Sequence, residues 1–126
     1  MVGIVLVSHS AKLAEGLADM LAQISGGDVP VAAAGGTDDG RLGTSPDRVR
    51  EAIREVDRGD GVVVIPDLGS AVLAVKSVLE LETDVAVLVD APFVEGAVSA
   101  AVVASTGAPL DAVTEAARQA RDVPKL

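Results

Sequence analysis

Four short runs of apolar residues alternate along the chain with segments whose apolar residues recur at helical spacing. The runs are Val2–Val7, Val29–Ala34, Gly61–Ile65 and Val85–Val89. Short runs that are largely apolar throughout are typical of strands covered on both faces of a parallel sheet. The segments between them therefore predict helices that connect one strand to the next.

The first helix is predicted over Ala11–Ser25, directly after the first apolar run. Its apolar residues recur at i, i+4, i+7/8 and i+11, which is the spacing of one helical stripe. They are Leu13, Leu17, Met20, Leu21 and Ile24. Ser10 or Ser8 can cap the start of this helix, and Gly26-Gly27 ends it.

A second helix is predicted to begin at Ser45-Pro46, where an N-cap residue precedes a proline suited to the first helical position. Its buried stripe consists of Val49, Ile53 and Val56. Gly59 lies just past its end. Three further helices are predicted over Ala71–Leu81, Gly96–Ser105 and Leu110–Arg121. Strand and helix therefore alternate four times, which predicts parallel strands joined by right-handed crossovers.

Pro30 lies in the second predicted strand, where it removes a hydrogen-bond donor from the ladder. This strand is therefore expected at a sheet edge, and the simplest strand order is 2-1-3-4. The predicted fold is a three-layer α/β domain, an open parallel sheet with helices on both faces, in one domain over residues 1–126. In such sheets ligands bind at the carboxyl ends of the strands, where the chain winds away in opposite directions.

The composition narrows the possible functions. The formal net charge is −9 and Phe93 is the single aromatic residue, so we expect no nucleic-acid partner. Cysteine is absent, which excludes disulfides, thiolate metal sites and cysteine nucleophiles. No apolar run reaches the ~18 residues of a membrane span. No basic residue of a signal peptide precedes Lys12. We therefore expect a cytoplasmic protein with no membrane partner.

Two polar segments follow the strands that flank the expected ligand site. Ser8-His9-Ser10 follows the first strand, and Pro66–Ser70 follows the third. An imidazole nitrogen can accept a phosphoryl group if a carboxylate holds the proton on the other ring nitrogen and helix-start N–H groups face the anion. The only histidine, His9, together with Asp67 and the Gly69-Ser70 turn, supplies these groups. His9 is therefore a candidate phosphoryl carrier.

The same residues also have structural interpretations. A lone histidine is often structural, Asp67 can simply cap the third helix, and Ser70 can be only an N-cap. Other chemistries lack their residues, because a histidine phosphatase needs a second histidine and no G-x-S-x-G, P-loop or G-x-G-x-x-G motif occurs. One histidine with scattered carboxylates predicts no metal site beyond weak association of Mg²⁺.

Four segments together resemble a known family. They are V-G-I-V-L-V-S-H-S (Val2–Ser10), G-G-T-D-D-G-R-L-G-T-S (Gly35–Ser45), P-D-L-G-S-A (Pro66–Ala71) and A-P-F-V-E-G-A (Ala91–Ala97). In order and spacing they are similar to the phosphotransferase subunits (DhaM) of PTS-dependent dihydroxyacetone kinases, whose domain resembles enzyme IIA of the mannose class. The S-H-S sequence and the D-L-G-S-A turn favour these kinase subunits over mannose-type transporter components.

The resemblance implies that His9 is phosphorylated and that Asp67 orients it. The candidate phosphate-binding residues are Ser10, Gly69 and Ser70. The family further implies a homodimer that binds no cofactor directly. It accepts phosphate from the carrier HPr and passes it to ADP on the nucleotide-binding kinase subunit. Leu68 and Leu42 are candidates for an apolar rim where partners dock.

Two other functions remain open. One is a mannose-class transporter component that passes phosphate to a cysteine- or histidine-bearing domain, and the other is a non-catalytic α/β module that binds a small anion. Longer relatives in the resembled family carry fused HPr-like and enzyme-I-like domains. A chain of 126 residues is therefore expected to take phosphate from a separate carrier.

Overall fold

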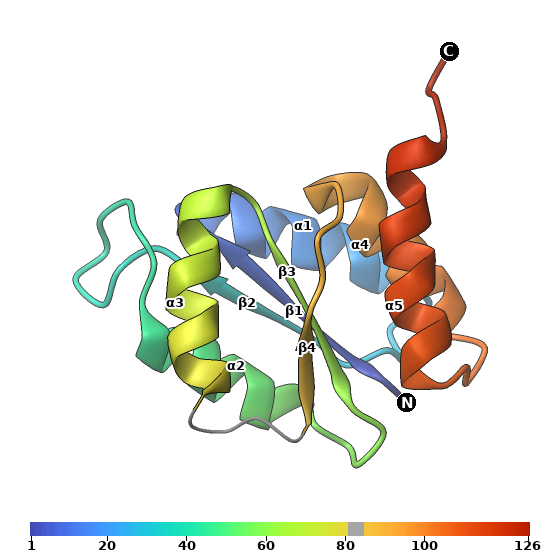
Figure 1. Ribbon diagram of the computed structural model, residues 1–126, viewed down its shortest axis with the longest axis horizontal. Coiled ribbons are helices and arrows are strands. Elements are labelled where there is room, and N and C mark those ends of the chain that lie inside the picture. Colours follow the sequence, from blue (N-terminus) through green and yellow to red (C-terminus); the bar gives the residue numbers. More distant parts are fainter. Residues whose placement is uncertain (81–84) are drawn as a thin grey trace.

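Four parallel strands lie in the order β2-β1-β3-β4, with helices on both faces of the sheet (Figure 1). The computed structural model describes residues 1–80 and 85–126. Its strands are β1 (Gly3–Ser8), β2 (Val31–Gly35), β3 (Val62–Pro66) and β4 (Ala86–Leu88). Its helices are α1 (Ala11–Ile24), α2 (Pro46–Val56), α3 (Gly69–Leu79), α4 (Phe93–Ala104) and α5 (Leu110–Gln119), the last continued by a 3₁₀ turn over Ala120–Asp122.

The predicted fold class and strand order are confirmed. β1 pairs on one side with β2, where Ile4 lies opposite Val31, and on the other side with β3, where Ile4 lies opposite Val63. β2 is an edge strand, as the position of Pro30 predicts. The carbonyl of Pro30 still accepts a hydrogen bond from the Ile4 N–H at 2.9 Å, since proline lacks only the donor.

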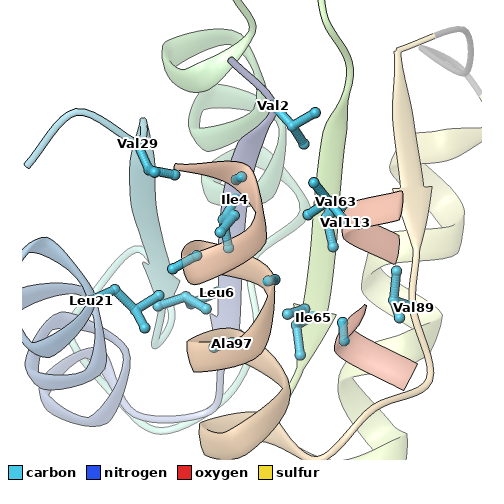
Figure 2. Close-up of a cluster of buried hydrophobic side chains, with 14 of the residues drawn as sticks. Val2, Ile4, Leu6, Leu21, Val29, Val63, Ile65, Val89, Ala97 and Val113 are labelled. Atoms are coloured by element: carbon cyan, nitrogen blue, oxygen red, sulfur yellow. The ribbon is translucent and has the colours of Figure 1, made fainter. Parts of the chain in front are cut away.

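The sheet is covered by two separate apolar cores, because successive side chains of each strand point to opposite faces. On one face Ile4, Leu6 and Ile65 pack against α1, α4 and α5 (Figure 2). On the other face Val5 and Val7 pack against α2 and α3. Every residue of β1 is buried, so this strand holds both layers together and fixes where its last residue meets the loops.

The predicted stripe on α1 is buried only in part. Leu17 and Leu21 face the core, but Leu13 and Ile24 are each nearly half exposed. Ala14, outside the predicted stripe, is fully buried instead. The buried arc of the helix is therefore rotated toward Ala14, and the other apolar flank of α1 is left at the surface. Periodicity alone gives the apolar stripe but not the part of it that the neighbouring elements cover.

Several boundaries also differ from the prediction. α3 begins at Gly69 rather than at Ala71, and α4 begins at Phe93 rather than at Gly96. The observed β2 and β4 also differ from the predicted ranges at their ends, and the predicted last residue of the third helix, Leu81, lies outside the described residues. The earlier start of α3 matters most, because it places Ser70 in the first turn of a helix beside the site.

Within residues 1–80 and 85–126, no helix is both long enough and apolar enough to span a bilayer.

Candidate functional site

The two polar segments lie side by side at the carboxyl ends of β1 and β3. Val7 is paired with Pro66 in the parallel ladder, and the Asp67 N–H donates to the Val7 carbonyl at 2.9 Å. The ladder therefore continues to the point where each strand ends. His9 and Asp67 follow these positions, so the backbone brings together two residues that are 58 positions apart in the sequence.

Asp67 holds both the ring and the main chain of His9. One carboxylate oxygen, Oδ1, lies 3.1 Å from Nδ1 of the ring. The other, Oδ2, accepts the backbone N–H of His9 at 3.1 Å and the hydroxyl of Ser8 at 2.9 Å. The Asp67 side chain is only 8% exposed, whereas the His9 side chain is 27% exposed. The ring is therefore held from the protein side and open on the other.

Two opposing effects set the pKa of Asp67. Burial raises this pKa, but the hydrogen bonds from the His9 backbone, the His9 ring and the Ser8 hydroxyl outweigh burial, so the pKa of Asp67 lies below its ordinary value. Asp67 is therefore a carboxylate at neutral pH and can only accept hydrogen bonds. The proton between the two side chains consequently belongs to Nδ1 of His9.

The other ring nitrogen faces the start of α3. Nε2 of His9 lies 2.8 Å from the hydroxyl oxygen of Ser70. In the neutral ring with its proton on Nδ1, Nε2 carries a free lone pair, so the Ser70 hydroxyl donates to it. Ser70 is the second residue of α3, and no side chain caps this helix. The site thus places a nucleophilic nitrogen, a hydroxyl and a helix N-terminus that favours anions at one point.

Ser10 has a different place from Ser70. Its hydroxyl caps α1 by accepting the Leu13 N–H at 3.2 Å, and its own N–H donates to the Ser8 hydroxyl oxygen at 3.0 Å. Gly69 is the first residue of α3. The roles of Ser10, Gly69 and Ser70 toward a phosphoryl group stay predictions.

Both predicted rim leucines are at the surface: Leu68 is 58% exposed and Leu42 is 80% exposed. Leu68 precedes α3, directly after Asp67. Leu42 belongs to a loop that is tied to the site, because the neighbouring Gly43 N–H donates to the His9 carbonyl at 2.9 Å. The loop is braced internally by the Thr37 hydroxyl, which donates to Asp39. An exposed leucine therefore adjoins each of the two segments of the site: Leu68 follows Asp67, and Leu42 lies in the loop that is bonded to His9.

Ser8, for which the sequence predicts no role beyond a possible helix cap, also belongs to the site. It is fully buried, and its hydroxyl bonds to the catalytic candidate Asp67 rather than capping a helix. One signal could have identified it. Ser8 ends an otherwise apolar strand that is buried on both faces, and a polar side chain in such a position needs a polar partner nearby.

Within the two described ranges, no group of three or more histidine, aspartate or glutamate side chains is placed to hold a metal ion. The chemistry available at this site is that of an imidazole, a carboxylate and hydroxyl groups.

Fold and site together define a class: an open α/β domain that presents a histidine–carboxylate pair at the switch point of its sheet. The chain belongs to the family described as the PTS system fructose IIA component, whose model matches residues 3–114. A crystal structure of protein EF1359, described as of unknown function, is 33% identical. It has a TM-score of 0.84 over 94% of this chain and 95% of that one.

Named relatives are similar over most of the chain. The phosphoryl donor subunit DhaM of PEP-dependent dihydroxyacetone kinase 2 from Listeria innocua is 42% identical over 81% of this chain and 85% of its own. The phosphotransferase subunit DhaM of Lactococcus lactis is 35% identical over 90% of each chain. The DhaM subunit of Klebsiella michiganensis is 40% identical over all of this chain, which spans 28% of that longer protein.

Proposed function

We propose that this chain is the phosphoryl donor subunit of a dihydroxyacetone kinase that depends on phosphoenolpyruvate. His9 accepts a phosphoryl group from the phosphohistidine of HPr and passes it to ADP on the nucleotide-binding kinase subunit, so that ATP is regenerated there. The observation that carries this proposal is the pairing of Asp67 with Nδ1 of His9, which leaves Nε2 as the free nucleophile. The named relatives support the choice of kinase over transporter.

In the first transfer, Nε2 of His9 attacks the phosphorus of the carrier's phosphohistidine as that P–N bond breaks. The electron pair of the broken bond returns to the carrier's imidazole. His9 becomes more positive during the attack, and the Asp67 carboxylate stabilises the proton on Nδ1. The Ser70 hydroxyl, no longer able to donate to Nε2, turns to an oxygen of the bound phosphoryl group.

In the second transfer, an oxygen of the β-phosphate of ADP attacks the phosphorus, and the N–P bond of His9 breaks. The bond electrons return to Nε2, which accepts the Ser70 hydroxyl again. Both transfers depend on positioning and electrostatics rather than on proton removal, since Nδ1 keeps its proton throughout. No cofactor held by this chain is needed.

The test is incubation of the purified chain with enzyme I, HPr and labelled phosphoenolpyruvate. We expect acid-labile, base-stable label on the wild type and none on His9→Ala. Mixing the labelled protein with the ADP-loaded kinase subunit should then form ATP. Label on His9→Ala would overturn the site. Label without ATP formation would favour a mannose-class transporter component, and no label at all would favour a non-catalytic module.

The family also implies a homodimer, which we include in the proposal. Support comes from apolar side chains left exposed on the helices of one layer, which include Leu13 and Ile24 on α1 and Val94 and Val102 on α4. Sedimentation equilibrium at micromolar concentration measures the mass directly. A mass of 12.6 kDa over the whole concentration range would show a monomer and contradict this part of the proposal.

A further inference from the structure

Ser8 is the last residue of β1, and its side chain lies between Asp67, which follows β3, and Ser10, which precedes α1. The residue is fully buried. Its hydroxyl oxygen lies 2.9 Å from Oδ2 of Asp67 and accepts the Ser10 N–H at 3.0 Å. The hydroxyl therefore links the start of α1, which follows Ser10, to the end of β3, which precedes Asp67.

The direction of these hydrogen bonds follows from the chemistry of the groups. A hydroxyl has one proton to donate, and a carboxylate can only accept. The Ser10 N–H uses a lone pair of the Ser8 oxygen, and the single Ser8 proton goes to Asp67, which can only accept. The bonds therefore run from the Ser10 N–H to the Ser8 oxygen, and from the Ser8 hydroxyl to Oδ2. Oδ1 is left free for the His9 ring.

We infer that Ser8 is a positioning residue of the phosphoryl relay: it holds the Asp67 carboxylate in the orientation that keeps the His9 proton on Nδ1 and leaves Nε2 as the accepting nitrogen. The inference rests on the proposed function of His9. Its geometric basis is that Oδ2 has two donors, the Ser8 hydroxyl and the His9 N–H, which together fix the plane of the carboxylate. Without the Ser8 hydroxyl, the two remaining side-chain contacts of Asp67 among the described residues, the backbone N–H and Nδ1, both belong to His9, so the carboxylate loses its one anchor outside the histidine that it orients.

A second serine offers a matched control, because it makes the same kinds of bond elsewhere. Ser45 is also buried, accepts the Arg48 N–H at 3.3 Å, and donates to Oδ1 of Asp38 at 2.7 Å. It caps α2, and its hydroxyl is hydrogen-bonded to Asp38 and Arg48 rather than to Asp67. Ser45→Ala thus removes a buried hydroxyl with a comparable loss of hydrogen bonding, without touching Asp67.

The experiment compares Ser8→Ala, Ser8→Thr and Ser45→Ala with the wild type. His9 is the only histidine, so nitrogen-15 labelling of imidazole gives one pair of ring signals whose shifts report the tautomer. In Ser8→Ala we expect a mixture of tautomers, a pKa of Asp67 raised toward its ordinary value, and phosphoryl transfer slowed about tenfold. Ser8→Thr should restore all three, and Ser45→Ala should change stability only.

The inference is overturned if folded Ser8→Ala keeps the wild-type tautomer and a transfer rate within twofold, or if Ser45→Ala shifts the tautomer equally. If Ser8→Ala does not fold, a pH titration of the wild type followed by NMR tests the inference instead. The chemical shift of the Ser10 amide should then change with the same midpoint as that of the Asp67 carboxyl carbon, and a Ser10 shift that does not change with pH overturns the inference. These spectra need no phosphorylation, so they separate failure of this inference from failure of the relay.

Discussion

Oδ1 of Asp67 lies 3.1 Å from Nδ1 of His9, while Oδ2 of the same carboxylate accepts the His9 backbone N–H. One carboxylate therefore fixes both ends of the histidine, its ring and its main chain. A ring held in this way cannot turn to offer Nδ1 to a partner without breaking the contact. The arrangement leaves Nε2, which faces the exposed side, as the ring nitrogen that the proposed transfer would use.

Asp67→Asn tests this selection directly. Oδ2 has two donors, so the amide oxygen of asparagine should take its place and the NH₂ group should face Nδ1. The ring would then carry its proton on Nε2, the atom that must attack phosphorus. We expect phosphorylation from HPr to slow by about 10²-fold or more, as for other catalytic histidines held in the wrong tautomer. The rate is measured by rapid quench, and the tautomer by nitrogen-15 shifts. A fast variant would reduce Asp67 to a structural residue.

The lowered pKa of Asp67 also predicts a pH dependence of stability. A carboxyl group whose pKa is lower in the folded state stabilises the fold above its unfolded pKa of about 4. This stabilisation is lost as the pH falls through the folded pKa, below that value. The free energy of unfolding of the wild type, relative to Asp67→Asn, should therefore decrease between about pH 5 and pH 2. Urea titrations at each pH measure it, and a constant difference would contradict the sign.

The meeting of His9 with Asp67 could be predicted from the sequence because it depends on topology alone. Pro30 indicates which strand is at the edge, and the edge places β1 beside β3. Once those strands are neighbours, the residues that follow them must be close. Neither side-chain rotamers nor exact helix boundaries enter this argument.

The contacts of Ser8 and Ser70 could not be predicted in the same way. Ser70 reaches Nε2 only because α3 begins at Gly69, and helix starts are uncertain by a residue or two from sequence. From the sequence, the Ser8 hydroxyl could equally cap a helix or bond to a carboxylate. In the fold it is buried and donates to Asp67. The exposed flank of α1 at Leu13 depends likewise on how the helix is rotated against its neighbours.

Leu68→Asp is expected to slow transfer from HPr without unfolding the protein. Leu68 is 58% exposed next to Asp67, so a charge there costs little stability, within about 0.5 kcal/mol for most surface positions. It would, however, place a desolvated charge under a docked partner. Val123→Asp is the control, because Val123 is 65% exposed and follows the 3₁₀ turn after α5, outside the residues assigned to the site and to the dimer surface. The rate of phosphoryl transfer from HPr and the melting temperature are measured for both variants. Equal slowing by both variants would argue against a local docking rim.

Gly35→Ala should damage the site through the backbone. A Cβ at Gly35 would lie 2.6 Å from the Ser10 carbonyl oxygen and 2.7 Å from Cα of Ala11. The start of α1, which directly follows His9 and Ser10, must move away, at a cost of about 1–3 kcal/mol. We expect both a lower melting temperature and slower phosphorylation.

Gly16→Ala supplies the control for this glycine. A Cβ at Gly16, in the exposed middle of α1, has no atom within 4 Å. Removing a glycine from a helix interior should stabilise the protein by about 0.5–1 kcal/mol and leave transfer unchanged. Opposite shifts in melting temperature, with loss of transfer only in Gly35→Ala, would show that the close approach of β2 to the start of α1 sets the position of His9. If Gly35→Ala transfers phosphate at the wild-type rate, the histidine is positioned by its carboxylate alone.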